Sequence, residues 1–355
     1  MNGYLFSRSD GDPELDLRGL LAVAKGFAPA QLLLTAVELR VFAVLGPGPL
    51  GVDELRERLD LHRRGCRPFL DALVDHGLLV RDGARYANTA IAARHLDANG
   101  PDYVGGWLRL TGGLYWLWPN LAASLRTGLP LAGPGDESGS HPREWDSTYV
   151  DAMAVGARAA AAAVATALDW PRYGSFLDLG GSNGTFAREL VRRHVALRGI
   201  CFDQPSLRDQ FDRASEAAPD VPPESVRFVG GDIASDPLPT SDVVVLGRIL
   251  HNCSEEERLA LLMRVRAAVP DTGAVLVFDQ LIGEAGAECP EANISSLDQL
   301  LFSDGGGEYT LSELHHWLRR AGFGRQFTQR IGNGPETLVV AFADAVAQAD
   351  HQAVR

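Results

Sequence analysis

From residue 171 onward, short apolar runs alternate with segments of helical periodicity, and this alternation limits the fold more than any other feature of the sequence. The apolar runs are residues 175–179, 198–202, 226–229, 242–246 and 274–278. Strands that alternate with helices form a parallel sheet with right-handed crossovers. We therefore expect an α/β domain with a mostly parallel sheet, whose ligand binds at the carboxyl ends of the strands.

The first hundred residues have a different pattern. Segments 52–61 and 67–76 place apolar side chains on one helical face, and Gly77 is expected to end the second helix. The stretch from Leu78 to Tyr86 then predicts two strands around an Asp82-Gly83 turn. Helices followed by a small strand pair predict a winged helix.

The region from Pro101 to Leu168 is expected to be helical, with aromatic side chains at its beginning. The segment from Pro130 to Pro142 is rich in glycine and proline and predicts a flexible loop. Asp151 to Trp170 is so rich in alanine that it predicts one continuous helix.

The chain of 355 residues contains 46 acidic and 33 basic residues, a formal charge of −13. This balance argues against a nucleic-acid or anionic-membrane partner held by phosphate neutralisation. One alternative stays open, a DNA-binding regulator that uses Arg63, Arg64 and Arg67 of the winged helix. A solvated helix start is the simpler interpretation of these arginines.

The compartment is predicted from three features. The N-terminus lacks the basic segment and apolar core of a secretory signal. The most apolar stretch, from Leu20 to Leu45, is interrupted by charged residues, glycine and proline, and we expect it not to span a membrane. The cysteines form no C-x-x-C pair, which indicates reduced thiols, no zinc framework and a cytoplasmic location. They are Cys66, Cys201, Cys253 and Cys289.

A glycine-rich loop, Asp178 to Gly184, follows the first predicted strand and opens a helix. Backbone N–H groups at such a position can approach a ligand closely. The dinucleotide fingerprint G-x-G-x-x-G is not met, and no Gly-Lys-Ser/Thr of a phosphate-binding loop follows. If the dinucleotide fingerprint began at Gly180, its other two glycines would have to be at the positions of Ser182 and Thr185. If it began at Gly181, they would have to be at the positions of Asn183 and Phe186. The loop therefore favours an adenosine-type ligand without a pyrophosphate.

Two acids at the next strand ends fit such a ligand. Asp203 lies about twenty residues beyond the glycines, where a carboxylate can accept both ribose hydroxyls. Asp232, in Gly230-Gly-Asp-Ile233, is placed to accept from the adenine amino group, with Ile233 against the ring. Either acid alone would also suit a turn or a cap. Three such features on successive strand ends favour a shared ligand.

With these motifs the chain resembles the small-molecule O-methyltransferases of the plant caffeate and bacterial polyketide-tailoring type, which use S-adenosylmethionine. The similar segments cover the glycine loop, the ribose acid, the adenine acid and a histidine motif. They are residues 178–184, 202–205, 230–233 and 247–252. The resemblance covers nearly the whole chain.

The resemblance implies a Rossmann-like methyltransferase domain preceded by a winged-helix dimerisation domain, and a homodimer. We expect the dimerisation domain in residues 1–100, a helical linker and substrate lid in 101–170, the catalytic domain in 171–345 and a tail in 346–355. It also implies a set of cofactor-binding residues. These are Asp178, Gly180, Gly181, Asp203, Gln204, Gly231, Asp232, Ile233 and Arg248.

By the same resemblance His251 is the general base. A phenol has a pKa near 10 and an imidazole one near 6.5, so the ring can take the proton as the methyl group moves. Asp279 and Glu308 match the family's two glutamates beside this histidine and are expected to orient it. Asp279 departs from the family's usual glutamate in being one methylene shorter, so its reach toward the ring is shorter.

The acceptor site is expected to include Met153, whose thioether suits an aromatic ring. The other implied members are Trp107, Trp116, Asn252 and Phe302. Asn252 departs from the family's His-Asp-Trp. We therefore expect O-methylation of an aromatic small molecule in specialised metabolism, without a metal. A C- or N-methyltransferase, and a relative that keeps the cofactor without methylating, stay open as alternatives.

Overall fold

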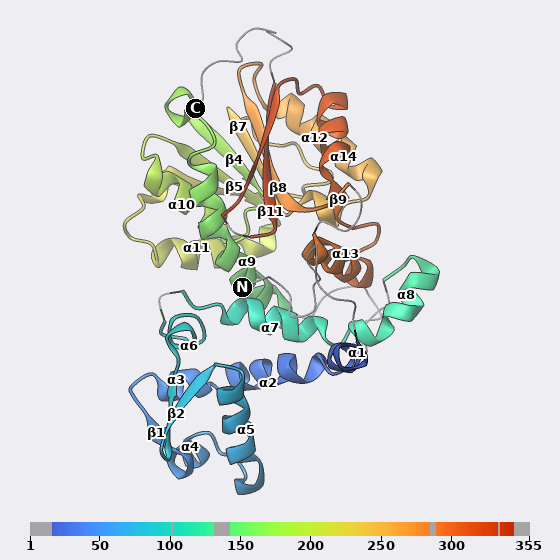
Figure 1. Cartoon of the computed structure of the whole chain (residues 1–355). Coiled ribbons are helices and arrows are strands. Elements are labelled where there is room, and N and C mark those ends of the chain that lie inside the picture. The colour runs from blue at the N-terminus through green and yellow to red at the C-terminus, as the bar shows by residue number, and fades with distance from the viewer. Residues whose placement is uncertain (1–15, 101, 131–142, 285–288, 333, 344–355) are drawn as a thin grey trace. The chain divides into compact units, whose positions relative to one another are not determined.

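The computed structural model describes residues 16–100, 102–130, 143–284, 289–332 and 334–343, with the side chains of 143–149 and 151 left out. The chain divides into two compact units (Figure 1). The first comprises Met1–Trp116 and His141–Val155, and the second Leu117–Ser140 and Gly156–Arg355. The predicted loop from Pro130 to Pro142 lies, beyond its first residue, outside the described residues. The predicted division into four regions stays a prediction.

The first unit is mainly helical. In chain order its elements are α1 (Leu17–Ala24), α2 (Phe27–Glu38), α3 (Val41–Leu45), β1 (Leu50–Gly51), α4 (Val52–Arg58), α5 (Arg63–Asp75), β2 (Leu79–Asp82), β3 (Arg85–Asn88), α6 (Ala90–His95) and α7 (Gly105–Leu114). The strands form a small antiparallel sheet in the order β1-β3-β2. The predicted hairpin is confirmed, because β2 ends at Asp82 and Gly83 adopts a φ of 56°.

A compact core holds the winged helix together. Phe42, Leu55 and Leu70 are fully buried in it, and Tyr86 of β3 is 1% exposed. The hydroxyl of Tyr86 donates to Asp71 Oδ1 of α5 at 2.6 Å, which ties the hairpin to that helix. The unit therefore has its own hydrophobic core, with a partly buried polar contact at its edge.

The expectation that the apolar N-terminal stretch does not span a membrane stays a prediction. Leu17–Glu38 is long and apolar enough to cross a membrane by length and composition, and little of it is buried. A bend around Lys25 and Gly26 separates α1 from α2 within it. Leu17, Leu21 and Phe27 are more than half exposed. Charged residues cluster towards the end of the predicted stretch, so its first part is more apolar than the whole.

The alanine-rich helix ends earlier than the sequence predicts. Helix α9 (Arg143–Val164) stops six residues before Trp170, where the short η2 (Trp170–Arg172) begins. The indole N–H of Trp170 donates to the Val164 carbonyl at 2.9 Å, a carbonyl that a longer helix would need. Pro171 also disfavours helical backbone at Trp170. Before α9, η1 (Trp118–Asn120) and α8 (Leu121–Thr127) complete this region.

The described part of the second unit contains an eight-stranded sheet, in which seven strands follow the order β10-β11-β8-β7-β4-β5-β6 and β9 pairs with β8. Its strands are β4 (Ser175–Leu179), β5 (Arg198–Asp203), β6 (Val226–Gly230), β7 (Val243–Gly247), β8 (Ala274–Ile282), β9 (Tyr309–Thr310), β10 (Gln326–Arg330) and β11 (Glu336–Phe342). Strands β6, β5, β4, β7 and β8 are parallel. The mostly parallel sheet is confirmed, and the antiparallel pair β10 and β11, which the sequence analysis did not predict, extends it.

Helices cover both faces of this sheet (Figure 1). The helices and short turns of the second unit beyond η2 are α10 (Thr185–Arg193), η3 (Pro205–Leu207), α11 (Arg208–Glu216), η4 (Pro223–Ser225), η5 (Leu250–Asn252), α12 (Glu255–Ala268), α13 (Pro290–Phe302) and α14 (Leu311–Arg320). Phe176 of β4 packs with α10 and α11, and the next residue, Leu177, packs with α12 and α14 on the other face. Strand β4 therefore lies at the centre of two buried clusters, and its carboxyl end leads into the glycine loop.

Asp242, the residue before β7, joins the beginnings of two central strands. Its Oδ2 accepts from the backbone N–H of Gly174 at 2.8 Å and of Ser175 at 2.9 Å. We predict that Asp242→Ala lowers the free energy of unfolding by about 1–3 kcal/mol, because these donors lose a charged acceptor. Asp271→Ala, which removes a 90% exposed partner of Arg266, is the matched control and should change it by less than about 0.5 kcal/mol. Urea denaturation measures both, and equal effects would contradict the assignment.

Candidate active site

The glycine loop between β4 and α10 has room only for glycine at two positions. A Cβ on Gly180, which has a φ of 76°, would lie 2.2 Å from Ile249 Cδ1. A Cβ on Gly181 would lie 2.6 Å from Asp178 Oδ2. The loop backbone is therefore packed against side chains from the neighbouring strand ends, and it exposes main-chain groups rather than side chains.

Asp203, the last residue of β5, holds this loop. Its Oδ2 accepts from the N–H of Ser182 at 2.8 Å, and its Oδ1 accepts from the N–H of Gln204 at 2.8 Å. Burial raises the pKa of the Asp203 carboxyl, and these two N–H donors oppose that rise. The predicted ribose acid therefore lies beside the predicted glycine loop.

Asp178 lies beneath the loop and is 5% exposed. Within the described residues its Oδ2 has no hydrogen-bond partner. Burial, and then the charge of Asp203, raise the pKa of Asp178 to about 7. The buried thiol of Cys201 donates to the Ser182 carbonyl at 3.5 Å, on the same side of the loop. A buried acid with an unpartnered oxygen thus lies directly under the glycines.

The adenine acid is engaged locally. The N–H of Gly231 donates to the Asp203 carbonyl at 2.9 Å, which places this turn beside the ribose acid. Asp232 is exposed, and its carboxylate accepts from the Ala234 N–H at 2.8 Å and from the Ser235 hydroxyl at 3.0 Å. These bonds lower the pKa of Asp232. Its role in the turn is therefore clear, and a contact with adenine stays a prediction.

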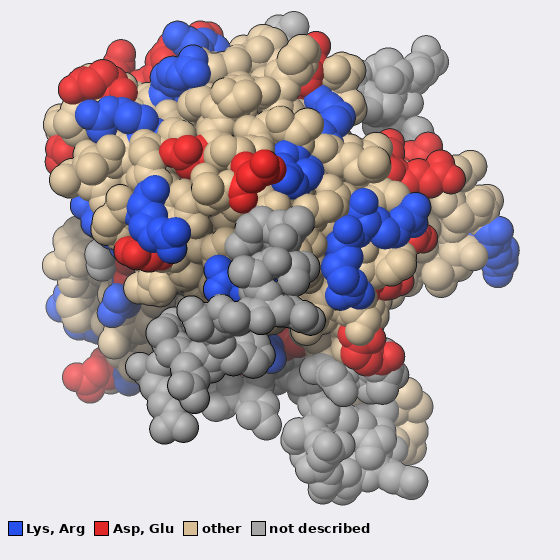
Figure 2. Space-filling view, turned by 90° about the horizontal axis from the view of Figure 1, so that it is seen from above, with Lys and Arg blue, Asp and Glu red and all other residues tan. Residues whose placement is uncertain are grey.

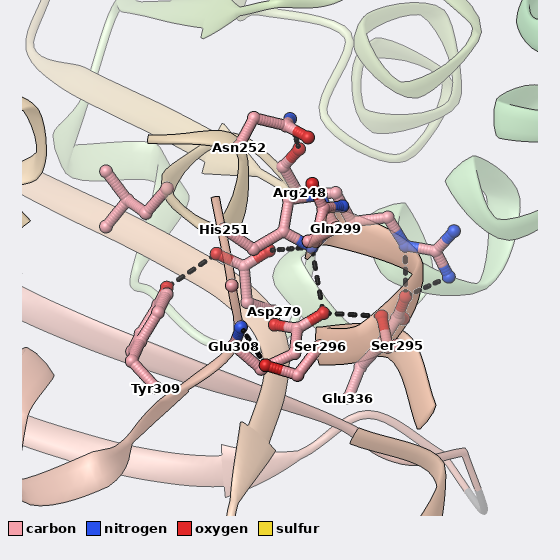
Figure 3. Close-up of polar contacts among 12 residues, drawn as sticks. Arg248, His251, Asn252, Asp279, Ser295, Ser296, Gln299, Glu308, Tyr309 and Glu336 are labelled. Atoms are coloured by element: carbon pink, nitrogen blue, oxygen red, sulfur yellow. Dashed lines mark hydrogen bonds and ion pairs between the residues drawn. The ribbon is translucent and has the colours of Figure 1, made fainter. Parts of the chain in front are cut away.

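His251 follows β7 in the short turn η5 and faces two carboxylates (Figure 3). Its Nδ1 lies 3.0 Å from Glu308 Oε1, a hydrogen bond. Ser295 of α13 donates its hydroxyl to the same Oε1 at 2.6 Å, and Ser296 accepts from the Glu308 N–H at 3.1 Å. Because Nδ1 is hydrogen-bonded to the carboxylate of Glu308, the neutral imidazole carries its proton on Nδ1. Its Nε2 is then free of a proton and can act as a proton acceptor.

Asp279 of β8 lies farther from the ring. Its Oδ1 is 3.8 Å from His251 Nδ1, which is too long for a hydrogen bond. Its Oδ2 accepts from the hydroxyl of Tyr309 at 2.5 Å. The structure therefore gives Glu308 the orienting contact, and Asp279 acts on the ring through its charge.

The side chains of Asp279 and Glu308 are fully buried, and that of His251 is 13% exposed. Burial lowers the pKa of His251, but the charge of Asp279 and the hydrogen bond to Glu308 outweigh it, so the pKa is raised above 6.5. Burial raises the pKa of Asp279 to about 7, and the charge of His251 opposes this rise. The cluster therefore binds a proton readily near neutral pH.

Arg248 directly follows β7 and has an unusual backbone conformation, with a φ of 56°. Its Nε donates to Glu336 Oε1 of β11 at 2.5 Å, and its N–H donates to the Phe278 carbonyl at 2.9 Å. Asn252 donates its side-chain amide to the Arg248 carbonyl at 3.1 Å. In this structure Asn252 closes the turn around His251, and its contact with an acceptor stays a prediction.

The remaining predicted acceptor residues are spread over the chain. Trp107 of α7, Trp116 and Met153 of α9 belong to the first unit, and Trp116 is 74% exposed. Phe302 is the last residue of α13 in the second unit. Their membership of one acceptor site stays a prediction.

The sequence analysis missed several polar residues around His251. These are Ser295, Ser296 and Tyr309, with Glu336 on Arg248. A second missed contact joins α13 to η1, where the carboxylate of Asp298 accepts from the indole N–H of Trp118 at 2.9 Å. Burial raises the pKa of Asp298 to about 6. Tyr309 could have been found from the sequence, because it directly follows the predicted Glu308. Nothing in the sequence marks Ser295 and Ser296, two serines within a helix, as neighbours of His251.

Comparison with known proteins assigns both parts of the chain. The O-methyltransferase domain matches residues 137–324, and the O-methyltransferase dimerisation domain matches residues 21–98. The tetracenomycin polyketide synthesis 8-O-methyl transferase TcmO of Streptomyces glaucescens is 40% identical over 92% of this chain and 98% of its own. The N,N-dimethyltransferase OxyT of Streptomyces rimosus is 33% identical over 90% of this chain and 94% of its own.

Among solved structures, human N-acetylserotonin methyltransferase in complex with SAM superposes with a TM-score of 0.84. It is 25% identical and covers 95% of this chain and 100% of its own. The fold, the domain matches and the similarity to the tetracenomycin enzyme agree with each other. The chain belongs to the O-methyltransferase family, whose cofactor is S-adenosylmethionine.

Proposed function

We propose that this enzyme transfers the methyl group of S-adenosylmethionine to a hydroxyl of an aromatic small molecule in natural-product biosynthesis. The observation that carries the proposal is the hydrogen bond between His251 Nδ1 and the buried Glu308. His251 follows β7 and the glycine loop follows β4, so both come after the carboxyl ends of parallel strands, where ligands of such sheets bind. The named polyketide O-methyltransferase among the relatives supports an aromatic acceptor.

The residues at the glycine loop fit the cofactor. Gly180 and Gly181 leave no room for a Cβ, so a ligand meets backbone there. A buried oxygen of Asp178 has no hydrogen-bond partner in the described part of the chain. Asp203, Gln204 and Arg248 would complete its polar surroundings, and the segment Gly231 to Ile233 would lie along the adenine. When bound, S-adenosylmethionine supplies an electrophilic methyl group on a sulfonium. The protein's part is to hold the acceptor oxygen in line with that group, which accounts for much of the rate.

His251 acts as the general base in this proposal. Glu308 fixes the tautomer through Nδ1, so Nε2 receives the proton of the acceptor hydroxyl. The imidazolium that forms is stabilised by two fully buried carboxylates, Glu308 and Asp279. Proton removal from a phenol with a pKa near 10 is otherwise unfavourable at neutral pH.

The proposed acceptor-binding residues are Met153, Trp107, Trp116, Asn252 and Phe302. We further propose a homodimer, supported by the match to the dimerisation domain and by the exposed apolar side chains of α1. A cytoplasmic location is proposed with it. Acidic and basic side chains are interspersed over the face in Figure 2, a distribution that fits a small-molecule enzyme better than a nucleic-acid-binding protein.

N-methylation is the second candidate, because one of the similar proteins is named an N,N-dimethyltransferase. Titration calorimetry with S-adenosylhomocysteine, followed by transfer of a radiolabelled methyl group to panels of polycyclic phenols and of aromatic amines, separates the two. Transfer to phenols supports the proposal, and transfer to amines alone replaces it. Binding without transfer to either panel would favour a non-methylating relative, and absence of binding would overturn both candidates.

Asp203→Ala should weaken S-adenosylhomocysteine binding by about 10–100-fold, because hydrogen bonds to a charged group contribute about 1.5–3 kcal/mol. Calorimetry on the purified chain measures this. Asp209→Ala removes an exposed acid from the first turn of α11 and serves as the control. An unchanged dissociation constant in Asp203→Ala would show that the ribose assignment is wrong.

His251→Asn should lower methyl transfer to the best phenol of the panel by about 10²–10⁴-fold, the usual contribution of a general base. Glu308→Gln should cause a smaller loss, because the glutamine can still hold the imidazole ring in place and only the negative charge beside the ring is removed. The dissociation constant for S-adenosylhomocysteine should stay within about twofold of the unaltered protein in both variants. Wild-type turnover in His251→Asn would remove its role as base.

The pH dependence of stability tests the buried acid. Asp279 has a folded pKa of about 7 against 3.8 for an unperturbed carboxyl, so the folded state holds its proton more tightly. The stability that this proton gives is complete below pH 3.8 and is lost as the pH rises to about 7. We predict that Asp279→Asn gains stability relative to the unaltered protein between pH 4 and pH 8. Thermal unfolding at a series of pH values would contradict this if the difference stayed constant.

A further inference from the structure

Arg258 of α12 contacts a neighbour of each member of the histidine cluster, which comprises His251, Asp279 and Glu308. It is 7% exposed, and its Nε donates to the carbonyl of Leu250, the residue before His251, at 2.8 Å. Its Nη2 donates to the carbonyl of Gly307, the residue before Glu308. Its guanidinium also lies over the ring of Tyr309, with 4.8 Å between Cζ and the ring centroid, and Tyr309 donates to Asp279.

The two segments that Arg258 joins are also in direct contact. The N–H of Gly307 donates to the His251 carbonyl at 2.8 Å. The guanidinium is rigid and planar, so one side chain fixes the separation of two carbonyls in a way that a flexible ammonium does not. Arg258 therefore bonds to the backbone next to both partners of the 3.0 Å contact between His251 and Glu308, and no hydrogen bond among the described residues joins it to either side chain.

Arg264, on the same helix, does the same for the predicted adenine turn. Its Nη1 donates to the carbonyls of Ile233 and Ala234, the latter at 2.8 Å, and its Nη2 donates to the carbonyl of Asp236. Asp236 in turn accepts from the N–H of Asp232 through its carboxylate at 2.8 Å. The three carbonyls belong to one turn, so Arg264 fixes its shape.

We propose that α12 positions both halves of the active site, with Arg258 as the positioning residue for the His251–Glu308 pair and Arg264 as the positioning residue for the adenine turn. The inference rests on the proposed function, in which His251 is the base and the turn Gly231 to Ile233 meets the cofactor. Neither arginine is a catalytic residue, because each acts through backbone that carries another side chain.

The test for Arg258 is the titration of the His251 imidazole, followed by NMR in the full-length chain labelled at histidine, with His251→Asn to assign the signal. Charged and titratable groups that face the ring come from several elements: Asp279 of β8, Glu308 before β9, Tyr309 of β9 and Arg248 after β7. Removing a cation near this cluster raises the pKa of His251 by charge alone. Loss of the Glu308 contact lowers it, so the two explanations differ in sign.

We expect Arg258→Met to lower the pKa of His251, and to leave the dissociation constant for S-adenosylhomocysteine within about twofold. Arg258→Lys keeps the charge and shortens the reach, and it should lower the pKa by a smaller amount. If Arg258→Met does not fold, the pKa of His251 in Arg258→Lys still tests the proposal. An unchanged or raised pKa in the lysine variant would overturn the assignment of Arg258.

Arg264→Met is expected to give the opposite pattern, with S-adenosylhomocysteine binding weakened at least fivefold and the titration of His251 unchanged. Arg266→Met is the matched control on the same helix, because Arg266 donates to the carbonyls of Gly322 and Ala343, away from both sites. It should leave both readouts unchanged. Equal effects of all three variants would show a general loss of stability and overturn the proposal.

These readouts are independent of methyl transfer. If the unaltered chain failed to bind S-adenosylhomocysteine, the proposed function would fail, and the titration of His251 would still decide the role of Arg258. If binding and transfer were normal and the Arg258 variants left the titration unchanged, only the present inference would fail.

Discussion

Two fully buried carboxylates stand beside one imidazole, and much of the surrounding structure follows from the cost of burying them. An ionised carboxylate in a protein interior is unfavourable unless hydrogen bonds or opposite charges compensate it. Tyr309 donates to Asp279, and Ser295 and His251 donate to Glu308. One oxygen of each acid still has no hydrogen-bond partner within the described residues. The remaining cost raises the pKa of Asp279 to about 7, so a proton that arrives at this cluster is held near neutral pH.

Local signals made it predictable that the glycine loop, Asp203 and the turn at Asp232 lie together. Positive φ at Gly180 and acids at the strand ends are properties of a short segment, and the order of strands brings those segments to one edge. The fold was predictable for the same reason, since the spacing of β-branched runs is visible in the sequence. Strand β10 was missed because it is largely exposed and alternates weakly, so its pairing depends on its neighbour. Strand β11 is buried and apolar, so its run was readable in the sequence and was overlooked.

Asp279 and Glu308 beside His251 were predicted from the resemblance, but the backbone and arginine contacts that hold this region were not, because they join residues far apart in the sequence. Arg258 and Gly307 are 49 residues apart, and Arg248 and Glu336 are 88 apart. No periodicity relates such pairs; only the packing of α12 and β11 on the sheet brings them together. The end of α9 at Val164 has a local cause, since the indole of Trp170, six residues further on, takes a carbonyl that alanine propensity alone would assign to the helix. Intrinsic propensity is a weak guide wherever one side-chain contact removes a backbone partner.

The choice of acceptor atom rests on proton chemistry more than on the fold. An 8-O-methyl transferase and an N,N-dimethyltransferase each match about nine-tenths of this chain, so the shared architecture does not decide between oxygen and nitrogen. A neutral amine has a nucleophilic lone pair before it loses a proton, whereas a phenol is protonated and a poor nucleophile at neutral pH. The hydroxyl acceptor is therefore the one that needs a base already oriented and backed by negative charge. His251 with Glu308 at 3.0 Å and Asp279 at 3.8 Å has that arrangement, and its construction from buried acids would be a needless cost for an acceptor that requires no base.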